Sequence, residues 1–181
     1  DVSVLFFVPV MWLAMFFHLQ SMTLRTFISS LFGLVCPYWF VAVYLIYTND
    51  ITLAVEHFSQ LAVFGKVANF SQVPVSALVS ICYITILSVV GIIHYLRNRV
   101  FDKTRTRMFY NTFILFDIFT IAFIILQPQH YATMLIILIV TTSPLIAHFI
   151  ALTNTWITNL AFKVIVATAL SLTIINILQL I

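Results

Sequence analysis

Charged side chains are scarce in this sequence. Only 7% of the 181 residues are Asp, Glu, Lys or Arg, whereas soluble domains carry roughly 25%. Apolar residues make up 63% of the chain, and several apolar runs approach or exceed the ~20 residues that a helix needs to cross a bilayer. Runs of this length without alternation are typical of transmembrane helices and not of β-barrel strands. The composition therefore excludes a soluble domain and predicts an all-α, polytopic transmembrane helical bundle.

Glycine and cysteine are also rare. The chain has three glycines and no GxxxG motif, so we expect its helices to pack through larger side chains and not through close glycine-mediated crossings. The two cysteines, Cys36 and Cys82, both fall in apolar runs. They form neither a disulfide framework nor a metal-ligand spacing, and they fit best as small apolar fillers.

The motifs of common catalytic and binding sites are missing as well. We find no HExxH motif and no paired carboxylates at the end of an apolar run, which membrane-embedded hydrolases and transferases usually carry. The net charge of +3 is concentrated in one segment, so it does not indicate nucleic-acid binding. We therefore expect a protein that is not an enzyme, with no cofactor and no metal.

The apolar runs predict a single transmembrane domain over residues 1–181. The chain begins with Asp1 and has no signal-peptide pattern, which predicts a fragment or a processed chain that lacks upstream spans.

Residues 50–70 show helical amphipathicity and predict a helix in the outer membrane interface; a buried or re-entrant helix is the alternative. The predicted membrane spans, six in number, cover residues 2–19, 27–47, 73–96, 109–127, 131–152 and 157–181.

Most of the positive charge lies between the third and fourth predicted spans. This segment, residues 97–107, separates two apolar runs, and short cytoplasmic loops are rich in Lys and Arg. We therefore place it on the cytoplasmic side, where it would also touch anionic lipid headgroups. With this orientation Arg25 and Lys163 fall on the inner side and Lys66 on the outer side. The segment holds five of the eight basic residues, namely Arg97, Arg99, Lys103, Arg105 and Arg107.

One acidic residue, Asp117, lies within a predicted span. A charged residue at bilayer depth costs about 2.5–3.5 kcal/mol, so it normally faces protein or water and has a partner. At ~1.5 Å per residue, Asp117 lies about 12 Å and Lys163 about 9 Å from the inner boundary. We therefore predict an intramembrane polar cluster, which is either a proton- or ion-linked transport site or a structural pair with hydroxyl groups; alternatively, Lys163 reaches the headgroups and never meets Asp117. Its candidate members are Asp117, Lys163, Thr141, Thr142, Ser143 and His148.

Histidines raise a further alternative. His18, His94 and His148 are predicted near the inner ends of their spans, and a bis-histidine haem needs two such ligands facing one another. Nothing in the sequence indicates that any two of them face each other. Each also fits as an interface residue, so we keep the expectation of no cofactor.

Residues 25–38, with the sequence RTFISSLFGLVCPY, resemble a segment of an uncharacterised family of multi-span inner-membrane proteins of Bacteroidota. In that family an Arg before a span is followed by a Gly-Leu-x-x-Pro-Tyr core. The resemblance implies a location in the bacterial inner membrane and no assigned activity.

Taken together, the residues favour a structural or accessory subunit of a membrane assembly, with the lipid bilayer and other membrane subunits or further copies of the chain as partners. The alternative is a small-molecule or ion transporter with a site around Asp117 and Lys163.

Overall fold

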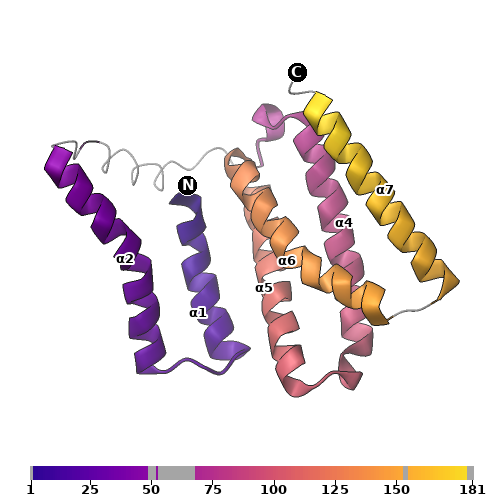
Figure 1. Ribbon diagram of the computed structural model, residues 1–181, viewed down its shortest axis with the longest axis horizontal. Helices are drawn as coiled ribbons and strands as arrows, with labels where there is room; N and C mark the ends of the chain where they lie inside the picture. Colours follow the sequence, from indigo (N-terminus) through magenta and orange to yellow (C-terminus); the bar gives the residue numbers. More distant parts are fainter. Residues whose placement is uncertain (1, 49–51, 53–67, 153–154, 179–181) are drawn as a thin grey trace. The chain divides into compact units, whose positions relative to one another are not determined.

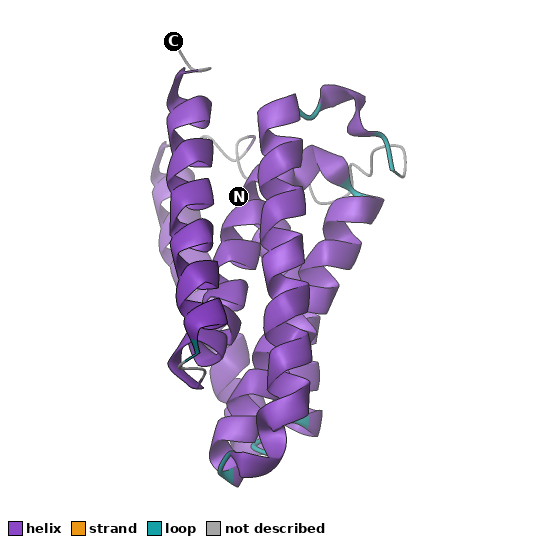
Figure 2. Ribbon diagram, turned by 90° about the vertical axis from the view of Figure 1, so that its right-hand side faces the viewer, coloured by secondary structure: helices purple, strands orange, loops and turns teal. Residues whose placement is uncertain are grey.

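The computed structural model describes residues 2–48, 52, 68–152 and 155–178. These residues form helices joined by turns, and Figure 2 shows no strand among them. The predicted all-α fold is confirmed. The chain divides into two compact units, Asp1–Lys66 and Val67–Ile181, each described by itself below (Figure 1).

The first unit contains a 3-10 helix, η1 (Val2–Phe6), followed by α1 (Phe7–Phe17) and α2 (Leu24–Thr48). The indole N–H of Trp12 donates a hydrogen bond to the Ser30 hydroxyl at 3.0 Å. The Trp12 ring also packs on Phe27 with ring centroids 4.9 Å apart. These two contacts tie α1 to the N-terminal part of α2.

The first predicted span forms a shorter helix than expected. η1 has 5 residues and α1 has 11, and together they cover roughly 26 Å at about 2.0 and 1.5 Å per residue. That is less than the ~30 Å of hydrocarbon. α1 ends at Phe17. Three residues later, Gln20 lies in the left-handed region at φ 47°, where the chain turns toward α2.

Among the described residues, five helices are long and apolar enough to cross a membrane. Their number and composition are those of a multi-pass membrane protein. The predicted interfacial helix at 50–70 lies almost wholly outside the described residues. The five candidate spans are Leu24–Thr48, Val75–Asn98, Thr104–Leu126, Pro128–Leu152 and Thr158–Ile175.

The second unit is a bundle of four long helices (Figure 1). α6 packs along both α4 and α5, and α7 lies against α4 and α6. The centre of the bundle contains Met134, Leu138 and Leu145, all fully buried on α6, together with several buried polar side chains. The helices are α4 (Val75–Asn98), α5 (Thr104–Leu126), α6 (Tyr131–Leu152) and α7 (Trp156–Leu178). The short 3-10 helix η3 (Phe70–Gln72) precedes α4, η4 (Arg99–Phe101) joins α4 to α5, and η5 (Pro128–His130) joins α5 to α6.

α4 and α6 approach each other closely at Gly91, contrary to the expectation from the low glycine content. A Cβ added at Gly91 would lie 2.9 Å from the Leu145 Cβ and 3.1 Å from the Leu145 backbone carbonyl carbon. Only glycine allows the two backbones to come this near. The prediction that such crossings are absent is therefore wrong at this one position, because a single glycine is enough for a local close approach.

Candidate functional site

Asp117 on α5 is fully buried and is surrounded by hydroxyl groups. The Ser88 hydroxyl of α4 donates to Asp117 Oδ2 at 2.7 Å. From α6, the Thr141 hydroxyl donates to Oδ1 and the Thr142 hydroxyl donates to Oδ2 at 3.2 Å. We call these four residues the Asp117 cluster. Because its members come from three helices, the cluster ties α4, α5 and α6 together.

The depths of these residues along their helices explain how the cluster forms. Thr141 and Thr142 are adjacent on α6, and both are buried. Ser88 lies eight residues before Leu96, at the end of the predicted third span, which places it about 12 Å from that boundary at ~1.5 Å per residue. This is the same depth as predicted for Asp117. The depth calculation could therefore have found Ser88, which the sequence analysis missed.

The hydrogen-bonding groups of the cluster suit two protonation states of Asp117. An ionised carboxylate can accept from all three hydroxyls. A protonated carboxyl can instead donate to Thr141, because the Thr141 hydroxyl also lies 3.0 Å from the carbonyl oxygen of Ile137 and can donate there. Neither state leaves the carboxyl without a hydrogen-bond partner.

Three predicted members of the cluster lie elsewhere, of which His148 is described separately below. Lys163 on α7 is exposed and makes no ion pair with any described residue. Two residues further along α7, the backbone carbonyl of Ile165 accepts a hydrogen bond from the Tyr83 hydroxyl of α4 at 2.8 Å. Ser143 is exposed on α6, because it is two residues past Thr141 and so points about 200° away around the helix. The structure thus brings Asp117, Thr141 and Thr142 together but not Lys163 or Ser143.

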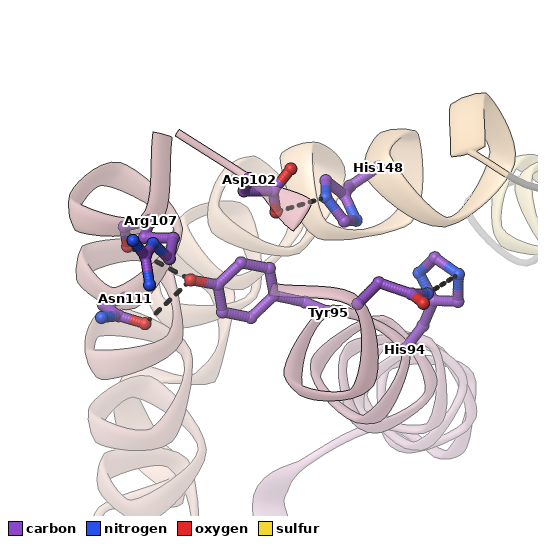
Figure 3. A network of polar contacts seen from close by, with 7 residues as sticks. His94, Tyr95, Asp102, Arg107, Asn111 and His148 are labelled. Atoms are coloured by element: carbon purple, nitrogen blue, oxygen red, sulfur yellow. Dashed lines mark hydrogen bonds and ion pairs between the residues drawn. The ribbon is translucent and has the colours of Figure 1, made fainter. Parts of the chain in front are cut away.

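His148 belongs to a second polar group at the end of the bundle near the basic segment. It shares a face of α6 with Thr141 but lies seven residues, about 10 Å, further along the helix. Its Nε2 is 3.1 Å from Asp102 Oδ2 (Figure 3). Its ring packs against those of Tyr95 and Tyr110 with centroids 5.6 and 4.7 Å apart. His148 therefore closes the loop end of the bundle and is not part of the Asp117 cluster.

Tyr95 on α4 joins this loop end to α5. The side chain is fully buried, and its hydroxyl lies 3.1 Å from Asn111 Oδ1 and 3.3 Å from the Arg107 backbone oxygen (Figure 3). One hydroxyl proton cannot serve both acceptors fully, so the contact is shared between them. The connection between α4 and α5 is thus held by side chains as well as by the chain itself.

The two histidines at this end are both engaged by protein groups. The His94 and His148 rings are in edge contact with centroids 5.6 Å apart. His94 Nε2 lies 2.7 Å from the Asn98 side-chain nitrogen, and His148 Nε2 is bound to Asp102. Within the described part of the chain, no group of three His, Cys, Asp or Glu residues is arranged to hold a metal ion.

We expect the contact between Asp102 and His148 to stabilise the loop end measurably. In a double-mutant cycle of Asp102→Ala and His148→Phe, the coupling free energy should be about 0.5–1.5 kcal/mol, the value of a typical hydrogen bond. Thermal unfolding of the purified protein in detergent measures it. A coupling below about 0.3 kcal/mol would mean that the contact contributes nothing to stability.

No family model, curated protein or solved structure shows significant similarity to this chain.

Proposed function

We propose that this chain is a structural or accessory subunit of a membrane assembly and that it has no enzymatic activity. Its location would be the bacterial inner membrane, with the basic segment at residues 97–107 on the cytoplasmic side. Five long apolar helices support a membrane location. The concentration of Lys and Arg at one end of the second unit supports the orientation, and the resemblance of residues 25–38 to a Bacteroidota family supports the choice of membrane.

The observation that carries this proposal is the complete enclosure of Asp117. Its side chain is fully buried, and three hydroxyls from neighbouring helices occupy its oxygens. A transport site needs a route by which water or substrate reaches the charged group, whereas a structural polar cluster is packed dry. The geometry of Asp117 fits the structural role better.

The exposed helices support partners for such a subunit. α2 has no buried residue within the described chain, and large apolar side chains such as Phe40 and Tyr44 are more than half exposed on it. In α7, Leu170 and Ile174 are similarly exposed. Lipid covers apolar surfaces of this kind, and so do the helices of other membrane subunits or of further copies of this chain.

A second candidate function is a proton-linked carrier, because the cluster suits both protonation states of Asp117. Pro144 within α6 adds to this possibility. It lacks a backbone N–H, so the carbonyl four residues earlier receives no helical hydrogen bond from it. Such interruptions occur where transporters coordinate ions or change shape. The two functions differ in whether water reaches Asp117.

Water access can be tested with a cysteine at this position. We expect Asp117→Cys, in a chain that also carries Cys36→Ala and Cys82→Ala, to resist a water-soluble maleimide in intact membranes. Both native cysteines are exposed, so they must be removed first. A Thr104→Cys variant in the same background is the positive control, because Thr104 is exposed at the start of α5. Mass spectrometry of the purified protein gives the labelled fraction.

Labelling of position 117 at a rate close to that of position 104 would reject the structural role and favour the carrier. A complementary measurement uses Asp117→Asn, which preserves most hydrogen bonds but cannot carry a proton. In proteoliposomes with a pH-sensitive dye, a structural subunit should give the same proton permeability with Asp117 or Asn at this position. A drop in proton flux with unchanged folding would also favour the carrier.

A further inference from the structure

A groove runs along the surface between α4 and α6 at the loop end of the second unit. Its volume is about 400 Å³, within the range of about 300–1,000 Å³ that small-molecule sites occupy. One part of its lining is polar and the other is apolar. The polar residues are His94, Arg97 and Asn98, and the apolar residues are Val90, Ile93 and Phe149.

Along α4, the groove changes from apolar to polar side chains in the same order as a membrane lipid changes from acyl chain to headgroup. Val90 and Ile93 lie within the apolar span, and Arg97 and Asn98 are at its end, where α4 gives way to the basic segment. A phospholipid presents the same sequence of groups, with acyl chains in the hydrocarbon and a phosphate at the interface. The lining therefore changes from apolar to cationic where a lipid changes from chain to headgroup.

Within the described residues, no acidic side chain compensates the charge of the groove. Arg97 is exposed and makes no ion pair with any described residue. The two acidic residues of the described second unit are both engaged elsewhere, Asp102 with His148 and Asp117 with its hydroxyls. Guanidinium groups bind phosphate oxygens through charge-assisted hydrogen bonds, so Arg97 favours an anionic ligand.

Neighbouring contacts hold the polar end of the groove in shape. The Asn98 side-chain nitrogen lies 2.7 Å from His94 Nε2, and the His94 ring packs edge-on against Phe149 with centroids 5.0 Å apart. In Figure 3, His94 lies on the opposite side of α4 from Tyr95, which points toward Asn111. The groove therefore lies beside the contacts that close the loop end, and it shares one ring contact with them, between His94 and His148.

We propose that this groove is a binding site for one anionic phospholipid, with the phosphate at Arg97 and Asn98 and an acyl chain along Val90, Ile93 and Phe149. Basic pockets between transmembrane helices bind anionic headgroups in this way. The site depends on the membrane location of α4 and not on whether the protein is an accessory subunit or a carrier.

Native mass spectrometry of the full chain in detergent tests the site with phosphatidylglycerol as the probe. We expect Arg97→Gln to lower the affinity for the first bound lipid about tenfold, as the loss of a charge-assisted hydrogen bond predicts. Arg105→Gln is the matched control, because Arg105 is also an exposed basic residue but does not line the groove. Equal losses in the two variants would mean diffuse attraction to the basic segment and would overturn the proposal.

The apolar wall is tested by a second pair of variants. Val90→Trp should fill the groove and lower lipid binding, whereas Val89→Trp should leave it unchanged. The two valines have similar exposure, 40% and 46%, but only Val90 lines the groove. Equal binding by both variants would overturn the proposal.

Soluble glycerol phosphate separates a lipid site from a simple phosphate site. We expect it to compete weakly, because it lacks the acyl chain. If it bound as tightly as phosphatidylglycerol, the groove would recognise a free phosphate and the lipid assignment would be wrong. Phosphatidylcholine, with no net charge, should also bind less tightly, and equal binding would overturn the requirement for an anionic lipid.

Discussion

Removing the three hydroxyls around Asp117 is expected to destabilise the second unit by about 2–5 kcal/mol. The change combines Ser88→Ala, Thr141→Val and Thr142→Val, which nearly preserve side-chain volume. Interhelical hydrogen bonds in membranes contribute about 0.6–1.7 kcal/mol each, and three of them end on this buried carboxyl. Without the hydroxyls, the carboxyl stays buried with no partner of its own. Unfolding of the purified protein in mixed micelles measures the loss.

A fourth substitution distinguishes a lost polar network from a poorly packed core. Asp117→Leu in the triple variant makes the whole cluster apolar, and leucine branches at Cγ as aspartate does. Replacing all members of a buried polar group by apolar residues is often close to neutral, so we expect most of the lost stability to return. If Asp117→Leu instead lowered stability further, packing and not the unpaired carboxyl would explain the effect.

The positions of the long helices followed from hydropathy alone, because a membrane span needs a long apolar run and little else. The predicted spans at 27–47 and 73–96 correspond to α2 and α4. α5 begins earlier than predicted, at Thr104, because Arg105 and Arg107 are good helix formers although they are too polar for an apolar run. Hydropathy gives the membrane-embedded part of a helix but not where its hydrogen bonding begins.

The candidate site was predicted in part, and depth explains both the success and the failures. Asp117, Thr141 and Thr142 lie at similar depths on facing helices, and the structure brings them together. Lys163 lies at a similar depth but on an exposed part of α7. Depth along a helix can be counted from the sequence, whereas the direction in which a side chain points around the helix depends on which neighbour it packs against.

The second large effect is expected at the close contact between α4 and α6. Gly91→Ala should destabilise the protein by about 1–2 kcal/mol. The new methyl group would lie 2.9 Å from the Leu145 Cβ, and overpacking of this kind costs about 1–3 kcal/mol. The higher helix propensity of alanine offsets about 0.5–1 kcal/mol of that cost. Thermal unfolding in detergent measures the difference from the unaltered chain.

Gly33→Ala is the matched control, because nothing lies within 4 Å of a Cβ at that position in α2. It should leave stability unchanged or raise it by up to about 1 kcal/mol.

Shortening Leu145 to alanine should not relieve the strain in Gly91→Ala, because the nearest atoms are the Cβ and the backbone, which alanine keeps. The coupling between these two substitutions should therefore be near zero. A large positive rescue by Leu145→Ala would show that the outer part of the leucine side chain, and not the approach of the two backbones, sets the spacing of α4 and α6.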